Sequence, residues 1–191
     1  MAKPRPLSFF GAWLFRQQHR WDWTFDPAAS AGDSSVRIRR EVGPAVTAGI
    51  RRLQKMGTGG WNGRRMLDHT SRMTLANVSG IAVGYAYLVE DLEQRDGWSL
   101  LDDVVVDASM RNRGIGHSLI AEMAAWLHAD GYTTVHGHAA GSGGIDIEGG
   151  LTGWYQRMGF EMSGTSGGLR ADVATLAQRT AHFRIAKHAQ G

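Results

Sequence analysis

Hydrophobic and polar residues are patterned along most of the chain, and the first clear pattern predicts a strand followed by a helix. The segment SVRIRREV, residues 35–42, alternates apolar and polar residues with the period of two that is typical of a strand. In the next segment, GPAVTAGIRRLQKMG, Ile50 and Leu53 fall on one helical face. Pro44 suits the first turn of this helix and Gly57 suits its C-terminal cap.

Residues 73–107 have the composition of three consecutive strands. Apolar, β-branched and aromatic residues dominate this stretch, and turn residues interrupt it at Ser79–Gly80 and at Gln94–Gly97. A glycine-rich connection, residues 58–72, separates the three strands from the preceding helix. The short turns predict antiparallel pairing in this half of the chain.

The strongest helix pattern lies in GIGHSLIAEMAAWLHADG, residues 114–131. Its apolar residues recur at helical spacing and form one stripe, which consists of Ile115, Leu119, Met123, Trp126 and Leu127. Gly131 ends the pattern, as glycine commonly does after the last helical turn. The next segment, YTTVHGHAA, is predicted to be another strand.

The remaining segments predict one short helix and two closing strands. LTGWYQRMG, residues 151–159, is expected to be a helix capped by Gly159. FEMSG, residues 160–164, and LRADVATL, residues 169–176, are expected to be strands. The predicted element order, β-α-(α)-β-β-β-α-β-α-β-β, is an α/β pattern with an antiparallel first half.

The first 33 residues are predicted to be an aromatic-rich extension of a single domain that spans residues 34–191. The small, turn-forming segment DPAASAGDSS, residues 26–35, is the candidate linker. The apolar run in MAKPRPLSFFGAWLF is much shorter than the roughly 20 residues of a membrane span, and no small-residue cleavage site follows closely. We expect these aromatic residues to dock on the domain or to act as an interaction arm.

Composition sets the broad class of the protein. The chain has 191 residues, of which 42% are hydrophobic and 20% charged, as is typical of one globular domain. It contains no cysteine, which excludes disulfides, thiol catalysis and cysteine metal sites and fits a cytoplasmic location. The net charge of +3 is carried almost wholly by arginine and suits an anionic small ligand or nucleic acid.

The basic turn RNRGIG, between the third of the three strands and the strongest helix, has the properties of a phosphate-binding loop. Gly114 and Gly116 remove side chains from the first helical turn, so its unpaired N–H groups are free to meet an anion. Arg111 and Arg113 add full positive charges whose geometry matches phosphate oxygens. The apolar strand before the turn puts it at a strand's carboxyl end, where α/β sheets bind ligands. Close packing at a strand-to-helix turn is the alternative interpretation.

Two common phosphate motifs do not match this turn. A dinucleotide fingerprint needs G-x-G-x-x-G after the first strand, but here Gly116 is followed by His117, Ser118 and Leu119. A P-loop needs G-K-[ST] at the start of the helix, and the chain has no such sequence.

At these residues the chain resembles the GNAT superfamily of acyl-CoA N-acyltransferases. The family motif R/Q-x-x-G-x-G/A, between a strand and a long helix, is matched by residues 111–116. The family's aromatic-Tyr-x-x-x-Gly-Phe block is matched by residues 154–160. Val104 and Val106 match the alternating apolar positions of the preceding strand, and the element order over residues 34–180 agrees as well.

The resemblance implies a fold and a co-substrate. The implied GNAT fold, of class α/β (α+β), has a mixed central sheet of roughly six to seven strands, splayed between strands 4 and 5, and about four flanking helices. The implied co-substrate is acetyl-CoA, whose pantetheine arm would pair with the backbone at Val104 and Val106 like an added strand. Its pyrophosphate would meet the backbone N–H groups of Asn112, Arg113, Gly114, Ile115, Gly116 and His117, with the side chains of Arg111 and Arg113 flanking it.

The reaction that the resemblance implies is direct attack of an amine on the thioester in a ternary complex. A lysine-like amine with a pKa of about 10.4 is almost wholly protonated at pH 7, so a base or a water chain must accept its proton. Asp102 and Asp103 are the candidate bases, and the sequence does not choose between them. Some family members carry a glutamate slightly earlier, where this chain has Leu100 or Leu101.

Two further groups are expected at the thioester. Tyr155 occupies the family's position for the acid that protonates the departing thiolate, although a purely packing role is the alternative. A strand bulge near Val104 to Val106 would supply the N–H donor for the developing oxyanion. The family often has an asparagine where this chain has Glu148, so acid groups at Asp146 and Glu148 are candidate replacements.

No metal site is expected. His136 and His138 lie two residues apart and share one face of a strand, but the sequence offers no obvious third ligand. Lining the cleft or relaying protons is a second interpretation of this pair, beside ordinary positions in a strand.

The expected partner is an amine acceptor, either a small molecule or a protein. The family's acceptor pocket is usually walled by the connection after the first helix and by the turn between the last strands, here residues 57–69 and 163–168. Trp61, Asn62 and Arg64 are candidate recognition residues in the first of these. The sequence leaves a homodimer open and predicts no membrane association.

Two rival functions belong to other classes. A non-catalytic acyl-CoA-binding module would bind the ligand without transferring its acyl group. A nucleic-acid-associated protein would explain the basic segments RIRR and NGRR, but these are dispersed and match no nucleic-acid-binding motif. The resemblance to the family favours an active N-acetyltransferase over these two alternatives.

Overall fold

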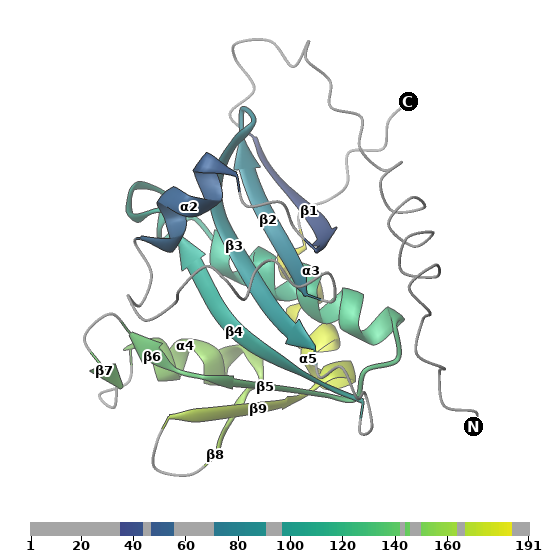
Figure 1. Ribbon diagram of the computed structural model, residues 1–191. Coiled ribbons are helices and arrows are strands. Elements are labelled where there is room, and N and C mark those ends of the chain that lie inside the picture. The colour runs from purple at the N-terminus through teal and green to yellow at the C-terminus, as the bar shows by residue number, and fades with distance from the viewer. Residues whose placement is uncertain are drawn as a thin grey trace. The chain divides into compact units, whose positions relative to one another are not determined.

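The computed structural model of the chain is shown in Figure 1. It describes residues 35–43, 47–55, 71–90, 97–141, 144–145, 150–163 and 167–184. Several predictions lie outside these ranges, namely those for the extension 1–33, Pro44, Gly57, Trp61, Asn62, Arg64, Gln94, Asp146 and Glu148.

A seven-stranded mixed sheet forms the centre of the domain, with strand order β1-β2-β3-β4-β5-β9-β8. Its strands are β1 (Val36–Val42), β2 (Arg72–Val78), β3 (Ile81–Glu90), β4 (Trp98–Val106), β5 (Thr134–His138), β8 (Glu161–Ser163) and β9 (Gly168–Asp172). Neighbouring strands run antiparallel except β4 and β5, which are parallel. A separate small pair consists of β6 (Ala140–Gly141) and β7 (Gly144–Ile145).

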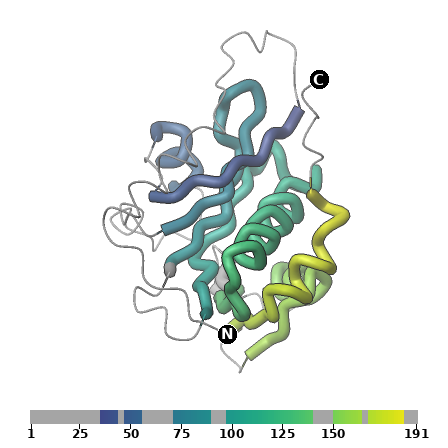
Figure 2. The backbone as a smooth tube through the Cα atoms, turned by 90° about the vertical axis from the view of Figure 1, so that its right-hand side faces the viewer, coloured from purple at the N-terminus to yellow at the C-terminus, as the bar shows by residue number. Residues whose placement is uncertain are grey.

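Helices cover both faces of this sheet, as Figures 1 and 2 show. They are α2 (Ala48–Gln54), α3 (Ile115–Ala129), α4 (Gly150–Met158) and α5 (Val173–Thr180), with 3-10 turns η2 (Ala108–Met110) and η3 (Ala181–Phe183). Helix α2 packs on β3 and β4 from one face, whereas α3 packs on β1 to β4 from the other and contacts α5. The predicted mixed-sheet fold is confirmed.

Two apolar clusters fill the two faces. The larger cluster surrounds α3, whose predicted stripe of Ile115, Leu119, Met123, Trp126 and Leu127 is at most 2% exposed. Burial of each such side chain contributes about 1.5–3 kcal/mol, so this stripe anchors the helix to the sheet. The smaller cluster lies under α2 and consists of Ile50, Leu53, Met73, Leu75, Ala82, Tyr85, Tyr87 and Val105.

The predicted hairpin between β2 and β3 is confirmed. Ser79 and Gly80 both have positive φ, 48° and 78°. A two-residue turn with positive φ at both positions matches the twist of antiparallel strands, which is why it connects them so tightly.

The prediction for residues 169–176 as one closing strand was wrong in its second half. Strand β9 ends at Asp172, and helix α5 begins at Val173. The Asp172 carboxylate accepts a hydrogen bond of 2.7 Å from the Thr175 backbone N–H, which caps the new helix. Val173, Leu176 and Thr180 then repeat at helical spacing and are buried.

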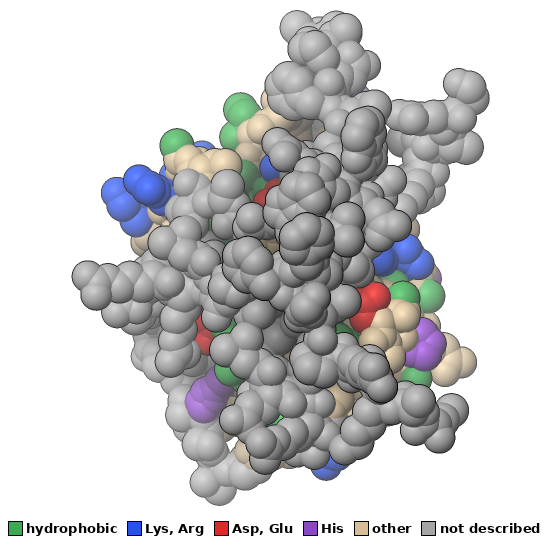
Figure 3. All heavy atoms as spheres, turned by 45° about the vertical axis from the view of Figure 1, so that its right-hand side comes forward, with side chains coloured by type: hydrophobic (Ala, Val, Ile, Leu, Met, Phe, Trp, Pro, Cys, Tyr) green, Lys and Arg blue, Asp and Glu red, His purple; other side chains and the backbone are tan. Residues whose placement is uncertain are grey.

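Helices of the described residues are all too short or too polar to cross a membrane. Figure 3 shows that the described basic side chains visible on one face lie in separate groups.

Candidate functional site

The parallel strands β4 and β5 are neighbours over a short distance only. Residues Trp98–Leu101 of β4 pair with Thr134–Gly137 of β5. Beyond Leu101, β4 continues to Val106, whereas β5 stays paired with β9, and the two strands diverge in Figure 1. From Asp102 onwards β4 therefore has no strand partner on this side among the described strands. The predicted splay of the sheet is confirmed here.

A β-bulge interrupts β4 where the two strands separate. Tyr87 of β3 pairs with Asp103, and the next residue of β3, Leu88, pairs with Leu101, so Asp102 is the extra residue. An inserted residue of this kind bends a strand and breaks its regular alternation. The sequence prediction placed a bulge near Val104 to Val106, whereas the structure places it at Asp102.

The bulge decides which side chains of β4 share a face. Before it, Leu101 packs into the cluster around α3; after it, Val104 packs into the same cluster and Val105 into the cluster under α2. Because side chains alternate along a strand, Asp103 lies on the α2 face together with Val105. Without the inserted residue, Asp103 would share the α3 face with Leu101.

Asp103 is hydrogen-bonded to a tyrosine that the sequence analysis did not select. The Tyr85 hydroxyl donates to Asp103 Oδ2 at 2.7 Å. Burial raises the pKa of the Asp103 carboxyl, the bond from Tyr85 lowers it, the charge of Asp102 raises it and the Val104 N–H lowers it. The net effect is a pKa above the usual value for aspartate.

Asp102 has a different environment. Its Oδ2 atom is buried and accepts no hydrogen bond from the described residues. The charge of Asp102 raises the pKa of Asp103, although burial and the hydrogen bond from Tyr85 have larger effects. It also raises the pKa of Tyr85, after larger contributions from burial and from Asp103. The two aspartates are neighbours at the start of the part of β4 that has no strand partner on this side among the described strands.

Backbone N–H groups line the unpaired edge of β4. The Asp107 N–H donates to the Val83 carbonyl of β3 at 2.8 Å. Since successive N–H groups of a strand point to opposite sides, those of Val104 and Val106 point away from β3. They face the edge from which β5 has separated.

The loop after β4 has the conformation expected of an anion site. Gly114 has φ 79° and forms the N-cap of α3 without any side-chain capping bond, so no cap side chain occupies the first N–H groups of the helix. Asn112 also has positive φ, 60°. Arg111, Asn112 and Arg113 are exposed, and Arg111 Nε donates to the Val106 carbonyl at 3.3 Å.

Close packing supports this loop from behind. A Cβ atom at Gly116 would lie 3.0 Å from the Trp154 ring, so glycine allows the ring to pack this closely. The His117 ring packs against Trp154 and Phe183, with centroid distances of 5.4 and 4.5 Å. Burial, followed by the nearby Arg157 and His182, lowers the pKa of His117. Gly116 thus has the packing role of the alternative interpretation, whereas phosphate binding by the loop stays a prediction.

Tyr155 lies in α4 and is 5% exposed. Its ring contacts Trp154 and Phe160 at centroid distances of 4.7 and 5.3 Å. Burial raises the pKa of the Tyr155 hydroxyl, and the charge of Asp103 raises it further. The electrostatic effect of Asp103 thus reaches Tyr155, although the two residues come from different elements.

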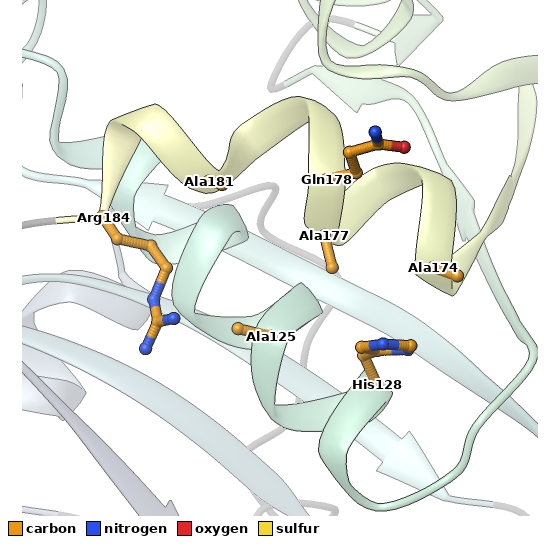
Figure 4. Close-up of a pocket in the computed structure, with 7 residues that line it drawn as sticks. All are labelled: Ala125, His128, Ala174, Ala177, Gln178, Ala181 and Arg184. Atoms are coloured by element: carbon orange, nitrogen blue, oxygen red, sulfur yellow. The ribbon is translucent and has the colours of Figure 1, made fainter.

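The two histidine candidates lie on the neighbouring strand β5, where His136 pairs in register with Leu100 of β4. His136 is half-buried and packs edge-on against Trp98 at 5.7 Å, and His138 is exposed. Within the described ranges, no group of three or more acidic or histidine side chains is placed to hold a metal ion. A hollow of about 350 Å³ between α3 and α5, which includes His128, Gln178 and Arg184, contains none of the predicted site residues (Figure 4).

These features define a class of protein. Its mixed sheet splays beside a bulged strand, and that strand leads into a glycine-containing loop at the start of a helix. Residues 69–162 match the family model described as the acetyltransferase (GNAT) domain. The chain belongs to the GNAT superfamily.

Solved structures with the same fold agree with this assignment. A GNAT family N-acetyltransferase (YhbS) from Escherichia coli in complex with CoA is 19% identical, with 77% of this chain and 87% of that chain covered and a TM-score of 0.56. A GNAT family acetyltransferase from Elizabethkingia anophelis with acetyl-CoA bound is 13% identical, with coverages of 72% and 97% and a TM-score of 0.55. At these identities the likeness shows the fold.

A third structure, PaiA N-acetyltransferase from Thermoplasma acidophilum in complex with coenzyme A, is 12% identical, with coverages of 72% and 99% and a TM-score of 0.51. No curated protein sequence matches the chain. Family and fold together support acyl transfer from an acyl-CoA as the general class of activity.

Proposed function

We propose that the domain over residues 34–191 is an N-acetyltransferase that moves the acetyl group of acetyl-CoA to a primary amine of a small molecule or protein. One observation carries the proposal: the unpaired edge of β4 leads directly into an uncapped helix start flanked by Arg111 and Arg113. An extended arm that ends in a pyrophosphate suits this continuous arrangement of donors and charge.

The backbone would bind acetyl-CoA in two sections. The N–H groups of Val104 and Val106 would pair with the amides of the pantetheine arm, because they point to the edge that β5 leaves open. The N–H groups of the loop from Asn112 to His117 would meet the pyrophosphate, where the dipole of α3 adds about half a positive charge. Arg111 and Arg113 are exposed beside this loop and would neutralise the phosphates.

We assign the base to Asp103. On the order of one in a thousand lysine-like amines is unprotonated at pH 7, so a base that removes the ammonium proton increases the fraction of reactive amine. A carboxyl whose pKa is raised by burial is a better proton acceptor than an ordinary aspartate. Asp103 takes one proton from the ammonium, and the freed nitrogen attacks the thioester carbon.

We assign the acid to Tyr155. The new C–N bond forms as the C–S bond breaks, and the departing sulfur takes a proton from the Tyr155 hydroxyl. Since burial raises the pKa of this hydroxyl, it stays protonated across the physiological range and remains available as a donor. The new amide nitrogen loses its second proton through solvent to the Tyr155 phenolate, and Asp103 releases its proton to solvent, so the products are an amide, free CoA and one proton.

The test combines binding with turnover on one sample. Acetyl-CoA at about 100 times its dissociation constant is expected to raise the melting temperature by roughly 5–10 °C. Thiol release would then be followed with a panel of amines, and the lack of cysteine removes protein background from this assay. Omission of the amine is the control.

Each outcome of this test has a distinct meaning. A thermal shift with amine-dependent thiol release supports the transferase. A shift without release from any amine favours the non-catalytic acyl-CoA-binding module. No shift at millimolar acetyl-CoA contradicts both functions and leaves the RNRGIG loop as a tight turn.

A further inference from the structure

Tyr85 occupies an unusual position beside the proposed base. It lies on β3, is fully buried in the cluster under α2, and pairs in register with Val105. A buried tyrosine hydroxyl needs a polar partner, and here that partner is the Asp103 carboxylate, at 2.7 Å. Hydrogen bonds from neutral donors to carboxylates are stronger than those between neutral groups.

We propose that Tyr85 is a positioning residue for the acyl-transfer reaction: its hydroxyl fixes one oxygen of the Asp103 carboxylate and stabilises the ionised form. This inference rests on the function proposed above, because it concerns the base of that reaction. Tyr85 reaches no reacting atom itself and acts through Asp103.

The bulge at Asp102 makes this contact available. It turns Asp103 to the α2 face, the face on which Tyr85 lies. With regular alternation, the carboxylate would share the opposite face with Leu101, and the sheet would separate it from the Tyr85 hydroxyl. The bulge and the tyrosine therefore act together to place one particular carboxylate at the point where β4 and β5 separate.

Opposing groups surround Asp103. Among the described residues, the ionised form is disfavoured by burial and by Asp102 and favoured by the Tyr85 hydroxyl and the Val104 N–H. Tyr155, on α4, is a titratable group whose pKa is raised by burial and then by the charge of Asp103. Met73 of β2, Ile50 and Leu53 of α2, all in the same cluster, are apolar and contribute only to burial.

Tyr87 provides a matched control. It is also fully buried on β3, belongs to the same cluster, and lies directly opposite Asp103 in the register. The hydroxyl that donates to Asp103 nevertheless belongs to Tyr85. Removing either hydroxyl takes one oxygen from the same cluster, but only one removal breaks the bond to the carboxylate.

The experiment is a titration of Asp103 by carboxyl-carbon NMR in full-length protein labelled at aspartate, with Asp103→Asn to assign the signal. Tyr85→Phe is expected to raise the Asp103 midpoint by about one pH unit, because the ionised form loses a charge-assisted hydrogen bond. Tyr87→Phe is expected to leave the midpoint unchanged. In turnover, the acidic limb of kcat/KM should move upward with Tyr85→Phe, while the KM for acetyl-CoA stays constant.

A second variant covers the case in which Tyr85→Phe does not fold. Replacing Tyr85 with 3,5-difluorotyrosine keeps the ring and makes the hydroxyl a stronger donor, so the Asp103 midpoint should fall. An unchanged midpoint with either substitution overturns the proposal, as does an equal change with Tyr87→Phe.

The titration also separates this inference from the proposed function. If the protein neither binds acetyl-CoA nor releases thiol, the transferase assignment fails, whereas the NMR midpoint still reports whether Tyr85 sets the state of Asp103. If turnover occurs but the midpoint does not respond to Tyr85, only the positioning role is lost.

Discussion

At the scale of single residues, the site depends on where charge is placed relative to buried surface. Asp103 carries a carboxylate into a cluster that is otherwise apolar or aromatic, and its pKa is raised as a result. A carboxyl whose pKa is higher in the folded than in the unfolded protein adds stability at low pH that is lost as pH rises through the folded value. The ionised Asp103 carboxylate is therefore expected to reduce the stability of the fold near neutral pH.

Asp103→Asn should make the protein less active and more stable at the same time. Loss of the base is expected to lower kcat/KM about 10²- to 10⁴-fold. The neutral amide still accepts from Tyr85 and removes the buried charge, so the melting temperature should rise at pH 8 and change little at pH 4. Melting curves at both pH values check this, and equal shifts at the two values would contradict it.

Tyr155→Phe should separate the acid from its packing role. The phenylalanine ring keeps the contacts with Trp154 and Phe160, so the melting temperature should stay close to that of the native chain. If the hydroxyl protonates the leaving thiolate, kcat and kcat/KM should fall together by about 10²-fold or more, with unchanged affinity for acetyl-CoA. Unaltered turnover would assign Tyr155 to packing alone.

Sequence reasoning selected both aspartates as candidate bases, and it could not predict which of them lies beside Tyr85. A period of two describes a regular strand, and nothing in DDVVVD indicates which residue is the extra one in the pairing with β3. Tyr85 was missed for a related reason, since its contact with Asp103 depends on the register of two strands rather than on either segment alone.

At the scale of elements, the loop before α3 combines left-handed backbone conformations with a helix start that no side chain caps. Gly114 and Asn112 hold left-handed conformations, and the helix start carries no side-chain cap. The element order and this loop were predictable, because glycine spacing and helical periodicity are local signals. Helix α5 was not predicted, because its segment follows strand β9 without an intervening turn. In composition, the capping residue Asp172 cannot be distinguished from the last residue of a strand.

Gly114→Ala should weaken acetyl-CoA binding through the backbone alone. With φ 79° and no atom within 4 Å of an added Cβ, the substitution meets no obstacle except the left-handed conformation, which disfavours it by about 1–2 kcal/mol. The loop is then expected to relax away from its native shape, raising the dissociation constant for acetyl-CoA in calorimetry.

Gly80→Ala is the matched control for this substitution. Gly80 has φ 78° and equally open surroundings, but it lies in the β2–β3 turn. Both variants should melt at lower temperature by about 2–8 °C, whereas only Gly114→Ala should bind acetyl-CoA less tightly. Equal loss of affinity in the two variants would mean that the effect is one of stability.

At the scale of the whole molecule, the sheet is continuous near Trp98 and divided near Val106. The division was predicted from the family resemblance, since the lengths of individual strands do not show where neighbours part. Its position follows from register: β5 leaves β4 after Leu101, one residue before the bulge.

Bound acetyl-CoA should act as the missing strand. We expect amide hydrogen exchange at Val104 and Val106 to slow when acetyl-CoA is added, because the Val106 N–H gains an acceptor and the Val104 N–H, which already meets the Asp103 carboxylate, gains a second one. The Asp107 amide, which already donates to Val83, is the internal control and should not change beyond the global stabilisation. Equal protection at all three amides would indicate stabilisation without strand-like pairing.

The division of the sheet has a consequence for solubility. A strand with unpaired backbone groups on one side is a template for edge-to-edge association with another chain, and edges of this kind are a recognised route to aggregation. Most edge strands lie at the outside of a sheet, but from Asp102 onwards β4 has no strand partner on one side among the described strands, in the middle of a sheet. Acyl-CoA in the cell would then do more than supply acyl groups: by occupying that edge it would keep newly made protein from self-association, so preparations stripped of CoA should aggregate faster than those that retain it.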